Sequence, residues 1–200
     1  MLYVPSVVRS QNKAELPSSQ ADVVKAEPTK NIVNQSVSGT LYTNGGTRFT
    51  LTIPEGWKAN DKLVEPRVGV GALTAPDGEA NLMIQLMLTP DDPKTFAKKI
   101  DAQGQSLFSG YHKVSESKVD VAGRNCEVLT LKYTDHRTVA GVAVDMPMVA
   151  RLVLVPKEYG FLVFEYVTLE SLFDKELPTF DKIMSSYRST AVGSAGTKPN

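Results

Sequence analysis

Three residue types that support nucleophilic catalysis occur together in the second half of the chain. Cys126 supplies a thiol, His136 an imidazole and Asp135 a neighbouring carboxylate. A thiol nucleophile needs a base, and the base needs a group that orients it, so this set defines one hypothesis, an enzyme that uses Cys126 and His136. Cys126, however, falls within an apolar stretch of alternating residues, where a small buried thiol is the ordinary explanation. We therefore expect no catalytic residue and no enzyme.

Carboxylates and a histidine also suggest two metal-binding sets. One combines Asp135 and His136 with Asp145, and the other is the pair Asp91 and Asp92. Neither has the spacing of a known ligand motif, and a helix start explains the pair better. The chain also lacks the glycine-rich and nucleophile motifs of nucleotide-binding and hydrolytic enzymes. We expect no metal site and no cofactor.

Composition limits the classes of partner. The 200 residues include 22 basic and 22 acidic side chains, so the formal net charge is zero. A nucleic-acid surface needs an excess of positive charge, and we expect none here. The longest apolar runs are interrupted by Gln85, Arg151 and Glu165. They are shorter than the roughly 18–20 residues that span a bilayer, so no transmembrane segment is predicted.

The stretch from Arg48 to Trp57 is the clearest structural signal. Phe49, Leu51 and Ile53 alternate with threonines, which predicts a strand with one buried face. The proline that follows ends the strand, and Trp57 then folds back as an apolar anchor of the core. Upstream, residues 44–46 (Asn-Gly-Gly) predict a hairpin turn that uses positive φ angles at these positions.

Strands and helices follow in the order of a layered domain. Residues 81–89 and 161–168 are apolar on both faces, which predicts central strands that are covered on both sides. Asp92 and Pro93 open a helix that ends near Gly110, with Phe96, Ile100 and Leu107 on its buried face. Further strands are predicted over 40–43, 67–75, 113–121, 124–133 and 148–155, with a loop over 135–141 and a final amphipathic helix over 171–187.

This order predicts an α+β fold with helices packed on a mainly antiparallel sheet. Residues 1–39 are polar and rich in proline, so we expect a mostly disordered tail or linker. The folded domain is expected over 40–189 and a flexible tail over 190–200. Four methionines, at 83, 87, 146 and 148, are expected mostly in the core, whereas an exposed methionine face would indicate a partner surface.

Two motifs carry a resemblance to a known family. The pattern of Phe49, Pro54, Gly56 and Trp57 resembles the first strand of Mog1/PsbP-like domains, a group that includes PsbP, DcrB-type lipoproteins and the DUF1795 set. The stretch from Phe180 to Tyr187 resembles the terminal helix of that family. The resemblance covers about residues 39–189 and implies an α/β/α sandwich around an antiparallel sheet.

The resemblance also implies a function. Such domains are generally accessory or protein-binding domains without catalytic residues, often outside the cytoplasm and tethered through an N-terminal lipid or anchor. We therefore expect an extracytoplasmic protein-binding domain, tethered upstream through its polar N-terminal segment, with an unidentified protein partner. The alternative is a cytoplasmic chaperone or adaptor of the DUF1795 type, with a partly uncovered sheet face that holds an apolar client segment.

Overall fold

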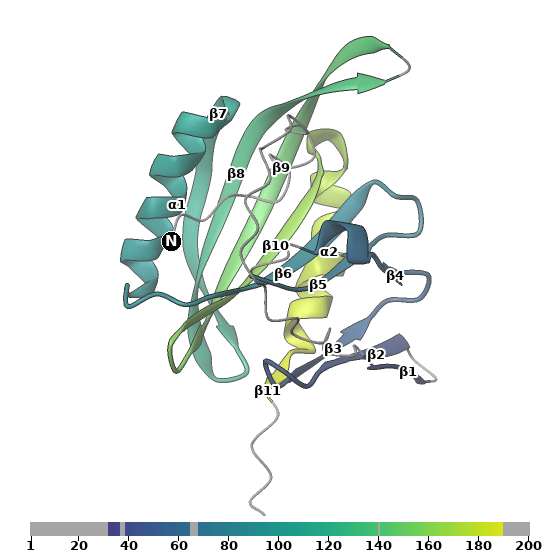
Figure 1. Cartoon of the computed structure of the whole chain (residues 1–200), viewed down its shortest axis with the longest axis vertical. Coiled ribbons are helices and arrows are strands. Elements are labelled where there is room, and N and C mark those ends of the chain that lie inside the picture. The colour runs from purple at the N-terminus through teal and green to yellow at the C-terminus, as the bar shows by residue number, and fades with distance from the viewer. Residues whose placement is uncertain (1–31, 37–38, 65–67, 140, 190–200) are drawn as a thin grey trace, which may run out of the picture.

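Two antiparallel sheets and two helices form the domain (Figure 1). The computed structural model describes residues 32–36, 39–64, 68–139 and 141–189. The larger sheet has seven strands in the order β4-β5-β6-β10-β9-β8-β7. Its strands are β4 (Lys58–Ala59), β5 (Gly69–Thr74), β6 (Ala80–Met87), β7 (Ser109–Val121), β8 (Arg124–Val139), β9 (Val142–Lys157) and β10 (Gly160–Leu169).

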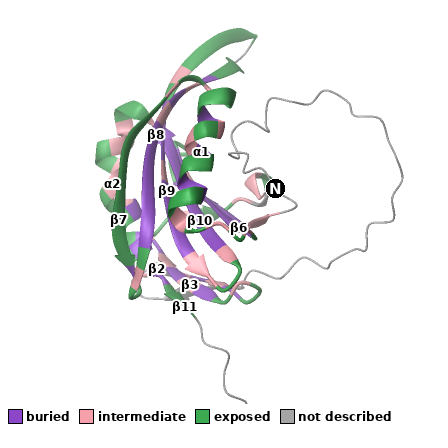
Figure 2. Cartoon of the chain, turned by 90° about the vertical axis from the view of Figure 1, so that its left-hand side faces the viewer, coloured by how far each residue is buried: buried purple, intermediate pink, exposed green. Residues whose placement is uncertain are grey.

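The two helices lie on opposite faces of this sheet (Figures 1 and 2). Helix α1 (Pro93–Leu107) covers one face, where Phe96 stacks on Phe161 of β10 with ring centroids 5.3 Å apart. Helix α2 (Phe173–Ser185) covers the other, where Phe180 stacks on Tyr166 of β10 at 5.0 Å. The expected arrangement of helices around a mainly antiparallel sheet is therefore confirmed.

The smaller sheet has the order β1-β2-β3-β11. It consists of β1 (Ile32–Ser36), β2 (Gly39–Asn44), β3 (Phe49–Ile53) and β11 (Arg188–Ser189). Strand β1 pairs with β2 along its whole length, although it falls within the stretch that we expected to be a linker. Residues 1–31 and 190–200 lie outside the described residues, so their assignment to tails stays a prediction.

Two apolar clusters fill the space on either side of the large sheet. Along β10, Leu162, Phe164 and Tyr166 point into the cluster under α2, and Val163 and Val167 point into the cluster under α1. Residues 161–168 are all buried, and Figure 2 shows this core of buried central strands. The prediction that β6 and β10 are central strands covered on both sides is confirmed. Apolar burial on both faces is the main stabilising contribution of such a layered fold.

Helix α1 begins as its sequence predicts. The Asp92 carboxylate accepts a hydrogen bond from the Thr95 backbone N–H at 3.0 Å, and Pro93 takes the first helical position. Phe96 and Ile100 are buried as expected, but Leu107 is 43% exposed, because the helix ends there. Gly110 does not end the helix; it lies in β7 with a φ of +61°.

Strands β8 and β9 extend well beyond their predicted ends. The predicted loop over 135–141 is wrong, because β8 continues to Val139 and pairs with a β9 that starts at Val142. The pairing of β7 with β8 reaches Thr134, and that of β10 with β9 reaches Met148. Beyond these residues the two strands form a two-stranded arm, which projects from the body in Figure 1. Charged residues and a glycine suggested a loop, but the cross-strand ladder decides the conformation.

The Arg48–Trp57 stretch forms β3 and the turn after it. Phe49, Leu51 and Ile53 are buried while the threonines between them are half-buried, which confirms the predicted alternation. In the preceding turn, the positive φ angle falls on Arg48 (+56°) and not on residues 44–46. Trp57 is half-buried and stacks on Tyr166 with centroids 6.3 Å apart, so it covers one end of the core.

Candidate functional site

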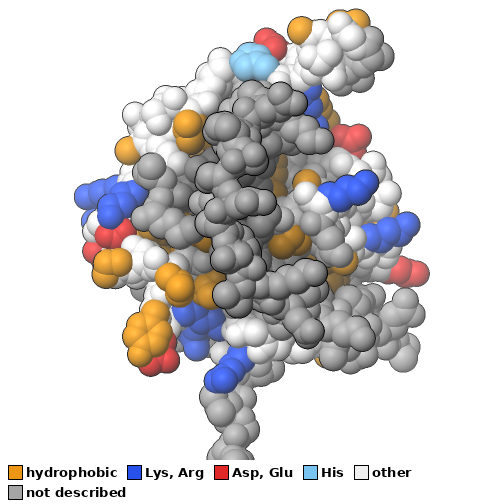
Figure 3. Space-filling view, in the orientation of Figure 1, with side chains coloured by type: hydrophobic (Ala, Val, Ile, Leu, Met, Phe, Trp, Pro, Cys, Tyr) orange, Lys and Arg blue, Asp and Glu red, His pale blue; other side chains and the backbone are white. Residues whose placement is uncertain are grey.

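Exposed apolar side chains meet where three connections of the chain come together. Two adjoining hollows, of about 520 and 640 Å³, share Leu88, Pro156, Lys157, Glu158 and Tyr159 as lining residues. We call this region the Leu88–Tyr159 surface. Leu88 is 65% exposed and Tyr159 is 72% exposed, although both are large apolar residues. In Figure 3, apolar side chains lie beside lysine or arginine side chains at the lower left, over the β6–α1 connection and the β9–β10 turn.

The turn that carries Tyr159 is fixed by close packing. Gly160 has a φ of +121°, and a Cβ atom there would lie 1.9 Å from the carbonyl oxygen of Met87. Only glycine fits this approach, so the β9–β10 turn is held against the end of β6. Leu88 follows Met87 directly, and the two exposed side chains therefore share one rigid base.

The loop between β6 and α1 is also ordered. Asp91 accepts a hydrogen bond from Thr89 Oγ1 at 2.9 Å and pairs with Lys99 at 2.7 Å. The hydrogen bond from Lys99, followed by that from Thr89, lowers the pKa of Asp91. Asp92 caps the helix beside it. These contacts join the loop that follows Leu88 to the start of α1.

One of the two hollows is rich in positive charge. Arg48, Arg124 and Lys157 line it together with Thr47 and Ser189. We call Arg48, Arg124 and Lys157 the cationic cluster. Arg124 Nη1 donates to the carbonyl oxygen of Pro156 at 2.7 Å, and Lys157 Nζ donates to that of Thr47 at 3.0 Å. Burial and the nearby Arg124 charge lower the pKa of Lys157.

The fold of the domain is similar to that of several solved structures. No protein-family model and no curated protein sequence matches the chain. LpqN of Mycobacterium tuberculosis, described as involved in cell envelope biogenesis, matches with a TM-score of 0.50 and 12% identity over 76% of this chain and 90% of that chain. The Saccharomyces cerevisiae Ran-binding protein Mog1p matches with a TM-score of 0.50 and 9% identity over 80% of this chain and 96% of that chain. This chain has a Mog1/PsbP-like fold.

A third solved structure is similar to this Mog1/PsbP-like domain. Cyanobacterial PsbP from Synechocystis sp. PCC 6803 matches with a TM-score of 0.49 and 19% identity, over 77% of this chain and 94% of that chain. At such low identities, the matches to LpqN and Mog1p establish the fold alone. The surface chemistry of the chain is therefore argued from its own residues.

The structure separates the residues of the catalytic hypothesis. Cys126 is completely buried, and burial raises the pKa of its thiol to about 11. His136 lies on the exposed arm, ten positions further along β8, which corresponds to roughly 33 Å at about 3.3 Å per residue. No proton can pass directly between groups so far apart, so the hypothesis of an enzyme using Cys126 and His136 is wrong.

The proposed metal ligands have other contacts. His136 Nδ1 lies 2.6 Å from Asp145 Oδ1 across the arm, while Asp135 points to the opposite face, is buried and pairs with Arg137. Asp91 and Asp92 serve the loop and the helix cap. In the part of the chain that the structure describes, no group of three or more metal-ligating side chains comes together.

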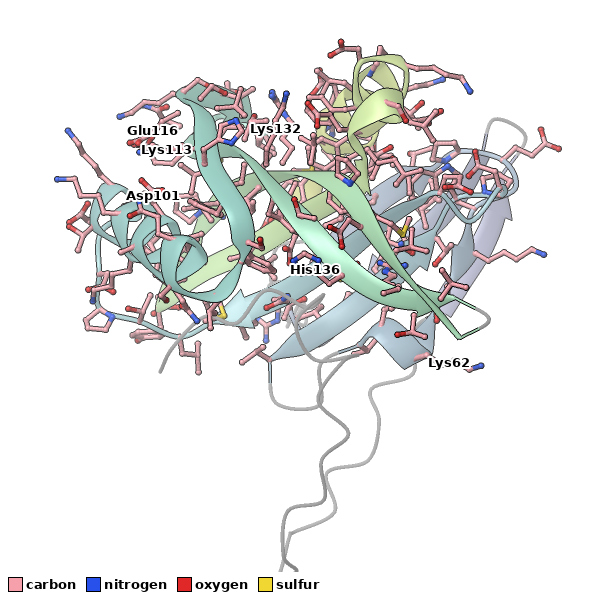
Figure 4. The ribbon with its side chains drawn as sticks, turned by 90° about the horizontal axis from the view of Figure 1, so that it is seen from above. Lys62, Asp101, Lys113, Glu116, Lys132 and His136 are labelled. Carbon is pink, nitrogen blue, oxygen red and sulfur yellow. The ribbon has the colours of Figure 1, made fainter. Side chains whose placement is uncertain are left out.

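Other charged clusters on the surface stabilise the fold. Figure 4 shows Asp101, Lys113 and Glu116 close together, with His136 well apart from them. Lys113 Nζ lies 3.0 Å from Asp101 and 2.8 Å from Glu116, which ties α1 to β7. Here the positive charge of Lys113 is balanced by two carboxylates, in contrast to the charges of the cationic cluster.

The methionine face that the sequence suggested as a partner surface does not form. Met83, Met87 and Met148 are buried and Met146 is half-buried, so methionines do not build an exposed face. The central strands β6 and β10 are covered on both sides, whereas the edge strand β7 is exposed along most of its length, so the chaperone alternative stays a prediction. Sequence reasoning missed the Leu88–Tyr159 surface, and the signal available was two large apolar residues beside turn residues.

Among the described helices, none is long and apolar enough to cross a bilayer.

Proposed function

We propose that this chain is a non-catalytic protein-binding domain and that its partner docks on the Leu88–Tyr159 surface. The observation that carries the proposal is the exposure of Leu88 and Tyr159 side by side on a fixed backbone. When a partner covers large apolar side chains that are otherwise exposed on rigid elements, apolar surface is removed from water, which favours binding. Mog1p, which shares the fold, is named for binding another protein, Ran.

The proposal includes a location outside the cytoplasm, with a tether through the N-terminal segment. The polar, proline-containing sequence of residues 1–31 suits a spacer between an anchor and a folded domain. LpqN, which shares the fold, is described as acting in cell envelope biogenesis. Protease accessibility of the native protein in intact cells and spheroplasts tests the location. Protection in spheroplasts with an intact inner membrane would contradict it.

Site-specific photocrosslinking tests the docking surface. A photoreactive phenylalanine analogue at position 159 should crosslink to one partner protein in the native host, and the same group at Val114 of β7 should not. Leu88→Ser and Tyr159→Ser should each weaken capture of that partner at least tenfold. Val114→Ser, which also removes an exposed apolar side chain, should leave capture unchanged. Equal crosslinking from positions 159 and 114 would contradict the proposed surface.

A further inference from the structure

The cationic cluster is built from three separate parts of the chain. Arg48 comes from the β2–β3 turn, Arg124 from the start of β8 and Lys157 from the end of β9. The hydrogen bonds of Arg124 and Lys157 to backbone carbonyl oxygens hold both side chains at the hollow. The fold, and not sequence proximity, thus brings these charges to one place.

The charge of this cluster is not neutralised by neighbouring carboxylates. Within the described part of the chain, the contacts of Arg124 and Lys157 are made to carbonyl oxygens, and neither cation forms an ion pair. The repulsion between them contributes to the lowered pKa of Lys157, after the effect of burial. Glu158 is the acidic residue that lines this hollow. A bound anion would relieve the repulsion, because an opposite charge favours the protonated lysine.

Both cations keep donors for a ligand. A guanidinium has five N–H donors, and the hydrogen bond of Arg124 to Pro156 uses one nitrogen, Nη1. A lysine ammonium has three donors, and Lys157 gives one to the carbonyl oxygen of Thr47. Carboxylates match this set, because the planar guanidinium binds two carboxylate oxygens at once.

The apolar neighbours distinguish a peptide from a small free anion. Leu88 and Tyr159 line the same hollow as Arg124 and Lys157, and they also line the adjoining hollow. A phosphate ion would contact the cations and leave the apolar side chains exposed. An extended polypeptide has acidic and apolar side chains within a few residues of one another, and so covers both.

We propose that the cationic cluster binds a side-chain carboxylate in an acidic segment of the partner protein, while an apolar side chain of the same segment packs against Leu88 and Tyr159. This inference rests on the proposed function and names the chemistry of its partner. The ligand motif is an aspartate or glutamate close to a leucine or an aromatic residue. Binding should weaken with rising salt, because the ion pairs are exposed to screening.

Selection from a displayed library of random peptides on the full chain tests the motif. Enriched peptides should carry an aspartate or glutamate within three positions of a leucine or an aromatic residue. The affinity of the best peptide should fall at least tenfold when its acid is changed to the amide, and at least tenfold in Lys157→Gln. Lys98→Gln, which removes an exposed lysine of α1, should change the affinity less than twofold. Absence of enrichment, or enrichment of peptides without acids, would overturn the inference.

A charge exchange separates binding from folding defects. Lys157→Glu should lose the selected acidic peptide and should bind the version in which the acid is replaced by lysine. Retention of the acidic peptide by Lys157→Glu would overturn the inference. The inference would also be overturned if the full chain enriched no peptide and instead bound inorganic phosphate, with the affinity and the dependence on Lys157 that are expected for the peptide.

The outcomes also separate this inference from the proposed function. If the cellular partner depends on Leu88 and Tyr159 but is held equally by Lys157→Gln, the docking surface stands and the acidic motif is wrong. If Leu88→Ser, Tyr159→Ser and Lys157→Gln all still capture the partner, both proposals are wrong.

Discussion

Gly160 lies against the backbone carbonyl of Met87 so closely that a Cβ atom would be 1.9 Å from the oxygen. This approach joins the β9–β10 turn to the end of β6 and sets Tyr159 beside Leu88. Since the contact involves backbone atoms on both sides, neither partner can move away easily. The stability of the domain and the geometry of the Leu88–Tyr159 surface therefore depend on the same glycine.

Gly160→Ala should destabilise the domain by about 2–4 kcal/mol, the sum of a positive-φ cost and a steric clash. Urea unfolding monitored by circular dichroism measures this change. Gly78→Ala is the matched control, because Gly78 has a φ of +81° but no atom within 4 Å of its Cβ position. It should cost about 1–2 kcal/mol from the φ angle alone. Equal losses in the two variants would show that the close approach has no energetic effect.

Trp57→Ala should reduce the free energy of unfolding by about 2–3 kcal/mol, since Trp57 is half-buried and stacks on Tyr166. This is below the roughly 3–5 kcal/mol range of fully buried large aromatic residues. Chemical unfolding followed by circular dichroism provides the measurement. Tyr159→Ala, at a 72% exposed site, should cost less than about 0.5 kcal/mol. A loss below about 1 kcal/mol for Trp57→Ala would mark that residue as part of a binding surface.

Asp101→Asn should lower stability at pH 7 by about 1 kcal/mol, because Asp101 accepts hydrogen bonds from Tyr111 and pairs with Lys113. Burial opposes the charged form of Asp101, but the hydrogen bonds from Lys113 and Tyr111 outweigh it and lower the pKa. A lowered pKa stabilises the folded state above the ordinary aspartate value of about 3.9, and this stabilisation is lost as the pH falls through the lowered pKa.

The difference between wild type and Asp101→Asn should therefore be constant near neutral pH and shrink below about pH 4. Thermal unfolding between pH 3 and pH 7 measures it. Glu55→Gln, at an exposed turn position, serves as the control and should follow the wild type. A difference that grows on acidification would contradict the assignment.

Cys126 should react slowly with a thiol reagent in the folded protein. The side chain is completely buried, and burial raises the pKa of its thiol to about 11, so little thiolate is present at pH 8. Labelling with an aromatic disulfide reagent should be at least about 100-fold slower than in urea, where the thiol is free. Rapid labelling of the native chain would contradict the burial and reopen the question of a reactive thiol.

Amide hydrogen exchange should distinguish the arm from the sheet. Residues 136–138 and 142–145 pair only across the arm in the described chain, whereas β10 is paired on both sides. An isolated two-stranded ribbon is marginally stable in water, so its amides should exchange at least tenfold faster than those of residues 162–166. Equal protection would indicate that the arm has a further partner in solution.

Local patterns in the sequence were sufficient for much of the scaffold. The alternation of Phe49, Leu51 and Ile53, the double-sided apolar strands and the Asp92–Pro93 helix start each depend on neighbouring residues. Burial on one or two faces and helix capping act over short distances in the chain, so the sequence shows them directly. The family motifs added the layered arrangement, which the structural comparisons confirm as a fold.

The tertiary structure alone decided the arm and the Leu88–Tyr159 surface. Hairpin pairing with residues 142–146 made residues 135–139 of the expected loop part of β8, and it placed His136 ten positions along that strand from Cys126. Arg48, Leu88, Arg124 and Lys157 belong to four different connections or strand ends, where sequence periodicity is weakest. Their proximity results from strand order and register, which depend on contacts between distant residues. The sequence thus determined both helices and most of the strands, while the packing of those segments decided which exposed side chains form one site.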